Sequence, residues 1–377
     1  MKASYDTIVI GAGAMGTAAA YHLARRGALV LCLEQFSIPH ARGSSHGESR
    51  KIRLTQFDMP QLYDLARRAY GHWDQLQEAC GRRIVYRNGG LYLGPPSCAF
   101  IDGLRASAQE HDLPHDELDR RQIAERYPQF QVPEHYRGVL DGTAGVLRPE
   151  RGVAAHAELA MRHGAVLRGH EPVTQWRSAG NHVTVTTPQA TYGADRLLIC
   201  GGAWSSKLVR DLGVQLTVTR QVLGWVWPAK PELFDLDTLP GWGLEDEQGR
   251  WYYGFPMLDG GLGMKVARDW KAAAADPDTI CRDAKQDDED DFRPCLRRYM
   301  PEADGPLLAI RVCMYTNSPD DRFIIDRHPQ YENVLVACGF SGSGFKYSPV
   351  VGEALADLAL EGRTDVPIDA FGLGRFG

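Results

Sequence analysis

The feature that most constrains the fold is the N-terminal run TIVIGAGAMG, residues 7–16, in which a short apolar strand leads directly into a glycine-rich turn. Residues 17–26 then have the pattern of an amphipathic helix that ends at Gly27, and residues 28–33 form a second apolar run that ends at Glu34. A strand, a helix and a second strand in this order predict a βαβ unit, in which the two strands are parallel.

Each glycine of the turn has a mechanical role in a dinucleotide-binding βαβ unit. One makes the tight turn, one lets the backbone approach a pyrophosphate, and one lets helix and strand pack closely; here they are Gly11, Gly13 and Gly16. The helix N-terminus offers unpaired N–H groups to the phosphates. Glu34, 18 residues after the last glycine, can accept a hydrogen bond from a ribose hydroxyl, which favours FAD or NAD over NADP. A glycine-rich turn kept for packing alone is the alternative.

Two later segments repeat the strand and glycine pattern. Residues 333–338 form an apolar run, followed by the loop GFSGSGFK, residues 339–346, and by a helical stretch over 350–360. Residues 196–200 lead into Gly201 in the same way. A nucleotide-binding lobe assembled from the beginning, middle and end of the chain suits an FAD enzyme whose flavin lies between two lobes. The common NAD dehydrogenase plan, with one uninterrupted nucleotide domain, fits less well.

The length of 377 residues and the hydrophobic content of 44% allow about two lobes with a substantial core. We expect an α/β fold with two domains. A discontinuous nucleotide-binding domain comprises residues 1–80, 146–215 and 314–377, and a second, inserted domain comprises residues 81–145 and 216–313. The formal net charge of −6 argues against a nucleic acid as partner.

The start of the chain lacks the basic segment, long apolar segment and cleavage site of a secretory signal, so we expect a cytoplasmic protein. No apolar stretch approaches the roughly 20 residues that cross a bilayer, so no membrane partner is expected. The eight cysteines are scattered, without CxxC pairs or zinc-like spacing, so neither disulfides nor a metal site is expected.

Seven motifs spread along almost the whole chain resemble those of one family. They are IVIGAGAMG (8–16), HARGSSHGESRKIR (40–53), YYGFP (252–256), GLGMK (261–265), VCMYT (312–316), FIID (323–326) and GFSGSGFK (339–346). In their order and spacing they resemble the monomeric sarcosine oxidase and N-methyltryptophan oxidase group of FAD-dependent amine oxidases. The resemblance implies a Rossmann-like FAD-binding domain with an inserted, mainly antiparallel substrate domain, in a monomer that acts on a small amine and O₂.

Cys313 taken alone is most simply a buried thiol that behaves as a small hydrophobe. Members of the group that the chain resembles carry FAD joined through its 8α-methyl to the cysteine of a motif like CMYT, so the resemblance implies covalent attachment at Cys313. Sulfur suits this role because a thiolate is a strong nucleophile.

The segment SSHGESRKIR gathers basic residues just after the first βαβ unit. On spacing alone this segment also fits a solvated basic helix start. The resemblance implies that His46, Ser49 and Arg50 line the flavin ring and that Arg53 meets a substrate carboxylate. Arginine suits that task because its planar guanidinium can bind a carboxylate through two parallel hydrogen bonds.

The resemblance assigns further residues. Lys346 is implied as a second cation for the carboxylate, although it also fits a surface lysine at a helix N-terminus. Lys265 is implied near the flavin, where its positive charge helps O₂ accept an electron, so we favour an oxidase over a dehydrogenase. Tyr253 and Tyr315 either line the substrate cavity or belong to the core. The remaining residues expected at the cofactor are Ser44, Val173, Gly342, Gly344 and Lys346.

The chain departs from the group where Asp269 stands four residues after Lys265, in place of a histidine. Asp269 can pair with Arg268, face solvent, or contact a cationic or hydroxylated part of a different amine. We therefore expect flavin-dependent oxidation of a secondary, N-methyl or cyclic, amino acid to an imine, which water then hydrolyses, with O₂ reduced to H₂O₂. The alternatives are an FAD-dependent dehydrogenase with another electron acceptor and a flavin-holding protein without catalysis.

Overall fold

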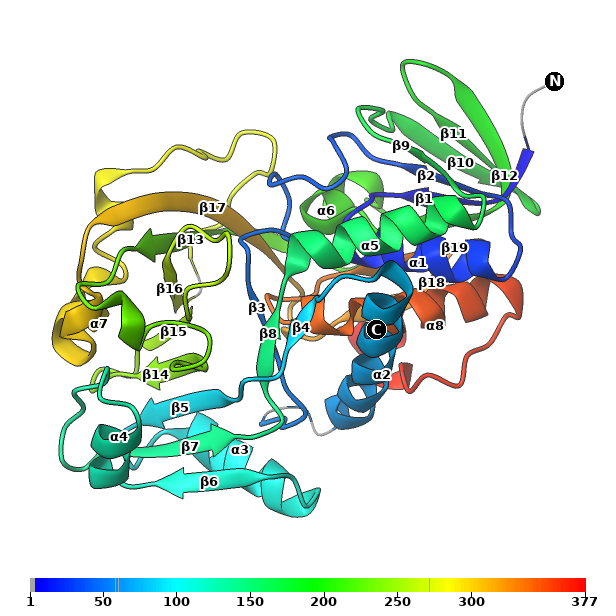
Figure 1. The fold of residues 1–377 in the computed structure, drawn as a ribbon. Coiled ribbons are helices and arrows are strands. Elements are labelled where there is room, and N and C mark those ends of the chain that lie inside the picture. The colour runs from blue at the N-terminus through cyan, green and yellow to red at the C-terminus, as the bar shows by residue number, and fades with distance from the viewer. Residues whose placement is uncertain (1–3, 58, 60, 271) are drawn as a thin grey trace.

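The structure, a computed structural model, describes residues 4–57, 59, 61–270 and 272–377. It contains two large sheets, with a small sheet between them (Figure 1). The first large sheet follows the order β10-β11-β12-β1-β2-β9, and β19 pairs with both β12 and β18. Its strands are β1 (Ser4–Ile10), β2 (Val30–Leu33), β9 (Val166–Arg168), β10 (Gln175–Ala179), β11 (His182–Thr186), β12 (Thr191–Ile199), β18 (Ile324–His328) and β19 (Tyr331–Cys338).

The expected βαβ unit is present at the N-terminus. β1 pairs in parallel with β2, with Ile8 opposite Leu31, and helix α1 (Ala14–Arg25) connects them. Gly27 has a φ of +87°, which glycine adopts without steric cost, and it turns the chain back toward β2. β12 and β19 extend the parallel part of the sheet, so the beginning, middle and end of the chain meet there as expected.

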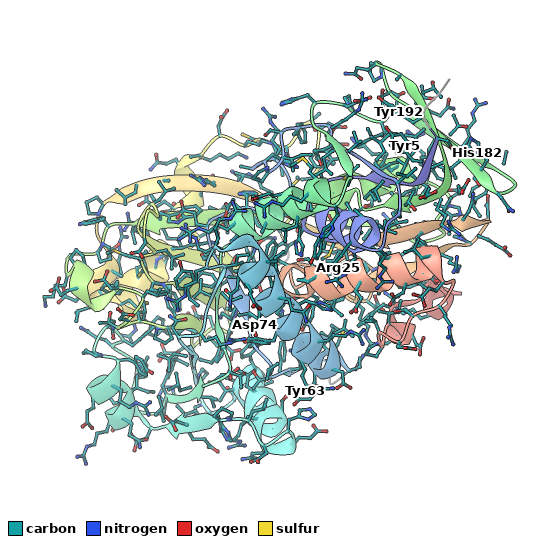
Figure 2. The ribbon with its side chains drawn as sticks, turned by 45° about the vertical axis from the view of Figure 1, so that its right-hand side comes forward. Tyr5, Arg25, Tyr63, Asp74, His182 and Tyr192 are labelled. Carbon is teal, nitrogen blue, oxygen red and sulfur yellow. The ribbon has the colours of Figure 1, made fainter. Side chains whose placement is uncertain are left out.

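The centre of the first sheet is buried on both faces, as a parallel sheet requires. Val9 belongs to a core that the sheet shares with helices α1, α2 (Leu62–Cys80), α5 (Pro149–Arg162) and α8 (Ser348–Leu360). Ile8 belongs to a second core on the opposite face. In Figure 2, Tyr63 and Asp74 mark α2, while Tyr5, Tyr192 and His182 lie together at the far end of the sheet.

The second large sheet follows the order β17-β13-β16-β15-β14-β5-β7-β6. All its neighbouring strands are antiparallel except β14 and β5. Its strands are β5 (Gly90–Gly94), β6 (His115–Leu118), β7 (Arg137–Asp141), β13 (Thr217–Val226), β14 (Gly241–Glu245), β15 (Trp251–Phe255), β16 (Met264–Asp269) and β17 (Leu307–Asn317). The other helices are α3 (Ala99–Glu110), α4 (Arg120–Arg126), α6 (Ser205–Leu208) and α7 (Arg293–Tyr299).

The small sheet has the order β3-β8-β4, with β3 (Arg50–Ile52), β8 (Gly145–Leu147) and β4 (Val85–Tyr86). The α/β fold class is therefore confirmed, with a mixed parallel sheet beside a mainly antiparallel one. We propose the domain boundaries given above; β17 runs across the one at 313/314. Within the described residues, no helix combines the length and apolarity needed to span a bilayer.

Candidate functional site

A cavity of about 430 Å³ lies where the first sheet meets β17. It is lined by the turns that follow β1, β2, β12 and β19, together with part of the loop over residues 39–45. The carboxyl ends of parallel strands are where α/β sheets bind nucleotides. The predicted site residues that line this cavity are Gly11, Gly13, Glu34, Ser44, Arg50, Val173, Cys313, Tyr315, Gly342 and Gly344.

The glycines of the first turn have separate physical roles. Gly11 has a φ of +94°, and a Cβ there would lie 2.4 Å from the carbonyl oxygen of Cys200. A Cβ on Gly16 would lie 1.7 Å from the carbonyl oxygen of Gly11, and Gly16 does not line the cavity, so it serves helix packing. A Cβ on Gly13 would meet only Ser45 Oγ, at 3.5 Å. Gly13 therefore leaves space in the cavity itself.

Glu34 is held at the cavity wall by backbone hydrogen bonds. Its Oε2 accepts from the N–H of Ala12 at 2.9 Å, and its Oε1 accepts from that of Phe36 at 3.0 Å. Burial by itself would raise the pKa of this carboxyl, but His40 and the two N–H groups outweigh it, so the pKa is lowered. A fixed, ionised carboxylate is thus present where a ribose hydroxyl could donate to it.

Cys313 lies on β17 with its side chain 2% exposed, and it also lines the cavity. Its sulfur is 3.7 Å from Nη2 of Arg50, whose guanidinium also donates to the carbonyl oxygens of Ser44, at 2.9 Å, and Ser49, at 2.8 Å. The guanidinium of Arg50 therefore lies beside the sulfur. Cys200 lines the same cavity, but burial raises the pKa of its thiol to about 12.

One face of the second sheet carries three further predicted side chains, those of Tyr253, Lys265 and Asp269. In β16, alternate residues share a face, and Lys265, Ala267 and Asp269 stand opposite Phe255, Tyr253 and Trp251 of β15. Trp225 of β13 lies opposite Lys265 and continues its row. In the row of Tyr253, Gly243 of β14 lies opposite Tyr253, and Tyr92 of β5 lies opposite Gly243. The strand register therefore brings these distant segments together.

Lys265 is 1% exposed, and its ammonium has two fixed acceptors. Its Nζ donates to the carbonyl oxygens of Gly47, at 2.8 Å, and Ser49, at 3.1 Å. The rings of Phe255 and Trp225 lie 5.3 Å and 5.5 Å from it. Burial and the charge of Arg50 hold its pKa well below the usual value.

His46 and Ser49 are each 1% exposed and lie outside the cavity lining. Neither ring nitrogen of His46, nor the hydroxyl of Ser49, has a hydrogen-bond partner. Burial and the charges of Arg50 and Lys265 lower the pKa of His46 to about 3, so the imidazole is neutral at physiological pH. Unpartnered buried polar atoms usually mark a place that a ligand or water completes.

Arg53 is 8% exposed, and its Nη1 has no hydrogen-bond partner. Its guanidinium lies 4.9 Å from the ring centre of Phe100, 5.6 Å from that of Phe57 and 5.7 Å from that of Tyr92. No carboxylate of the described residues forms an ion pair with it. A buried cation without a partner is costly, so this arginine is arranged to bind an anion.

Asp269 lies close to two tyrosines. Its side chain is exposed, as one of the alternatives expected, and desolvation raises the pKa of its carboxyl. The pKa values of Tyr253 and Tyr315 are both raised. Burial is the largest cause, and the charge of Asp269 is the second largest. Arg268 pairs with Asp291 at 3.7 Å, so the expected alternative of an Arg268–Asp269 pair does not form.

Lys51 belongs to the same group and was not predicted from the sequence. Its Nζ donates to the carbonyl oxygen of Trp242 at 3.0 Å and lies 4.6 Å from the ring centre of Tyr92. Burial, then Arg53 and Lys346, lower its pKa well below the usual value, and Asp269 opposes them. Below, the term charged recess means the residues Lys51, Arg53, Tyr253, Asp269 and Tyr315.

Residues 50–52 form strand β3, so the alternative of a basic helix start is wrong. The period-2 alternation of a strand could have found Lys51, because residues two apart, such as Lys51 and Arg53, project to the same side. Lys346 is half-buried at the edge of this region; its Nζ donates to the carbonyl oxygen of Ser343 at 3.1 Å. Within the described part of the chain, no cluster of metal-ligating side chains occurs.

Comparisons with known proteins agree with this geometry. The family model of FAD dependent oxidoreductases matches residues 6–358. The chain is 43% identical to the monomeric sarcosine oxidase of Streptomyces avermitilis, over 98% of this chain and 97% of that protein. It is 34% identical to the N-methyl-L-tryptophan oxidase of Salmonella arizonae, over 99% of each.

Among solved structures, the open form of NikD, an amino acid oxidase essential for nikkomycin biosynthesis, aligns with a TM-score of 0.87 and 26% identity, over 98% of this chain and 97% of that one. A matching family model and full-length relatives above 30% identity agree with the resemblance drawn from the seven motifs. The chain therefore belongs to the FAD-dependent oxidoreductase family, in the group that contains monomeric sarcosine oxidase and N-methyltryptophan oxidase.

Proposed function

We propose that the protein oxidises a secondary amino acid, N-methylated or cyclic, to an imine that water hydrolyses, and that O₂ is reduced to H₂O₂. The observation that carries this proposal is the buried Nη1 of Arg53, which has no hydrogen-bond partner and stands three residues after Arg50, a residue that lines a cavity that fits a dinucleotide. The names of the relatives support the same chemistry, because they act on sarcosine and N-methyl-L-tryptophan.

The residues present fit FAD. Gly11, Gly13 and the fixed carboxylate of Glu34 suit the adenosine and pyrophosphate half, and Val173, Gly342 and Gly344 line the same cavity. FAD, when bound, supplies the two-electron oxidation of the amine and passes the electrons to O₂. We further propose that Cys313 holds it covalently, as an 8α-S-cysteinyl group, at a sulfur that lies 3.7 Å from Nη2 of Arg50.

The charged recess binds and orients the amino acid in this proposal. Arg53 takes the carboxylate in two parallel hydrogen bonds, and Lys346 adds a second positive charge. Tyr253 and Tyr315 line the walls, and neighbouring cations help to hold the amine unprotonated, because they oppose a further positive charge. His46, which is neutral at physiological pH, adds no charge there.

We propose that Lys265 supports the reaction with O₂. Its ammonium is fixed by two carbonyl oxygens in a water-poor site, where a positive charge stabilises a developing superoxide more than it would in bulk water. The alternative is an FAD-dependent dehydrogenase that passes electrons to another acceptor. A Lys265→Met variant separates the two, because only an oxidase should lose flavin reoxidation by O₂, by about 100-fold or more, while reduction by the amine changes little.

The first experiment on the whole proposal is an absorption spectrum followed by acid precipitation. Yellow colour that stays in the pellet, and that is absent from the pellet of a Cys313→Ser variant, supports the covalent link. Anaerobic mixing with sarcosine, N-methyl-L-tryptophan and pipecolate then tests amine oxidation, and peroxide release in air tests the acceptor. A flavin that no amine bleaches would contradict the proposed reaction. The monomeric state and the cytoplasmic location stay predictions.

A further inference from the structure

Lys51 and Lys265 are both desolvated lysines of the same region, but their hydrogen bonding differs. Lys265 donates to two carbonyl oxygens, whereas Lys51 donates to one, that of Trp242 at 3.0 Å. An ammonium has three N–H donors, so Lys51 keeps two that no described residue accepts. Lys51 is only half-buried, so those donors can reach a ligand in the charged recess.

No carboxylate of the described residues forms an ion pair with Lys51. Asp269 and Asp141 lie near enough to raise its pKa, but neither is within 4.0 Å of its Nζ. The oxygens of Asp141 are already occupied, because Thr55 Oγ1 donates at 2.5 Å and the backbone N–H and Oγ1 of Thr143 donate at 2.8 Å and 2.6 Å. The free donors of Lys51 are therefore left for a bound molecule.

Arg53 is the second cation beside the same ring. The Tyr92 ring centre lies 4.6 Å from Lys51 Nζ and 5.7 Å from the Arg53 guanidinium, and the Tyr92 hydroxyl is buried without a partner. Two cations flanking one aromatic ring repel each other, and that repulsion is relieved when each binds an anion. One substrate carboxylate on Arg53 and Lys346 leaves Lys51 without one.

We propose that Lys51 binds a second carboxylate of the substrate, so that the protein acts on N-substituted amino acids with an acidic side chain, of the N-alkyl aspartate or glutamate class. This inference rests on the proposed function. The α-carboxylate lies on Arg53, the side-chain carboxylate on Lys51, and the amine faces Tyr253, Tyr315 and Asp269.

The test compares matched substrates in the holoenzyme. Anaerobic flavin reduction is measured with N-methyl-L-aspartate and N-methyl-L-glutamate and with the monocarboxylate N-methyl-L-alanine. The variants are Lys51→Gln, which keeps a donor for Trp242, and Lys51→Arg, which keeps the charge. Lys230→Met, at an exposed lysine paired with Glu302, is the surface control. Binding of succinate and butanoate, followed by the change in flavin absorbance, gives a readout that needs no turnover.

We expect the wild type to favour the dicarboxylates by about tenfold or more, which is the effect of one charged hydrogen bond. Lys51→Gln should lose this preference, Lys51→Arg should keep most of it, and Lys230→Met should equal the wild type. A wild type without the preference, or a Lys51→Gln variant that retains it, would overturn the inference. If no amine reduces the flavin but succinate still binds better through Lys51, the proposed reaction fails while the role of Lys51 stands.

Discussion

The two parts of the site are built in different ways. The nucleotide cavity is formed largely by backbone, at turns where Gly11 and Gly13 leave room and where Glu34 is fixed by two N–H groups. The charged recess is formed by side chains, and there Arg53 and Lys51 lack an ion-pair partner among the described residues. The nucleotide cavity depends on the shape of the backbone, whereas the charged recess depends on positive charges that an anionic ligand would pair with.

This difference predicts different responses to mutation. A change in the cavity acts through steric conflict, so it should affect folding and cofactor content with every substrate alike. A change at the charged residues of the recess, which do not line the cavity, acts through electrostatics, so it should affect substrates according to their charge and leave the cofactor in place. Single substitutions in each part separate these two behaviours.

Gly16→Ala should have the largest effect, because its Cβ would lie 1.7 Å from the carbonyl oxygen of Gly11. The helix and the first turn would have to move apart, at a cost of about 3 kcal/mol or more in the free energy of unfolding. We expect little folded protein, measured by expression in the soluble fraction and by urea denaturation. The matched control is Gly71→Ala within α2, where a Cβ meets nothing within 4 Å and helix propensity improves. Equal stability of the two variants would contradict the packing role of Gly16.

Arg53→Gln should reduce kcat/KM for amino acids by about 100-fold, because a buried charged hydrogen bond to the carboxylate is worth about 2–5 kcal/mol. The flavin content should stay that of the wild type, since Arg53 does not line the nucleotide cavity. Both are measured on the same preparation, by steady-state kinetics and by the ratio of flavin to protein absorbance. Arg67→Gln, at an exposed position of α2, is the control. Loss of flavin in Arg53→Gln would break the separation between the two parts.

The sequence predicts these two parts unequally, and the reason is physical. The first turn of the cavity and Glu34 belong to one contiguous βαβ segment, so the spacing of Gly11, Gly13, Gly16 and Glu34 was enough to predict that part of the cavity. The recess arises from strand register, which sets Tyr92, Gly243, Tyr253 and Ala267 in one row although they are far apart in the chain. Periodicity within one segment carries no information about that register.

Individual residues show how far the site can be predicted from the sequence. The family resemblance suggested Tyr253, Tyr315 and Asp269 for the substrate site, and the structure brings them together, but their roles stay predictions. Lys51 was missed because it stands between two arginines in a basic run, and only its orientation, set by β3, distinguishes it from a solvated charge.

Gly13→Ala tests the cavity without disturbing the fold. Its Cβ would meet only Ser45 Oγ, at the ordinary contact distance of 3.5 Å, so the apoprotein should keep its stability within about 0.5 kcal/mol. The methyl group would instead occupy space where a pyrophosphate approaches the backbone, so we expect about tenfold weaker uptake of FAD. Flavin content at limiting FAD and the urea midpoint of the apoprotein measure the two effects. A variant that loses stability but binds FAD normally would assign Gly13 to packing, with Gly16.

The smallest effect concerns His46, whose environment is set by the charges that border the recess. Burial and the cations Arg50 and Lys265 lower its pKa to about 3 in the folded chain, whereas the unfolded chain has a usual value of about 6.5. The unfolded state therefore takes up a proton first as the pH falls below about 6.5, so His46 reduces stability progressively from there toward pH 3. Between pH 6.5 and 5.5 this loss of stability amounts to about 1 kcal/mol.

A His46→Asn variant of the cofactor-free chain lacks this titration, so between the same two pH values it should lose about 1 kcal/mol less stability than the wild type. Urea denaturation at both pH values measures the difference. His182→Asn, at an exposed position on the far end of the first sheet (Figure 2), should match the wild type. If His46→Asn and the wild type had the same pH dependence, the histidine would be solvated in the apoprotein, and the water-poor character of the region would depend on the bound cofactor rather than on the fold.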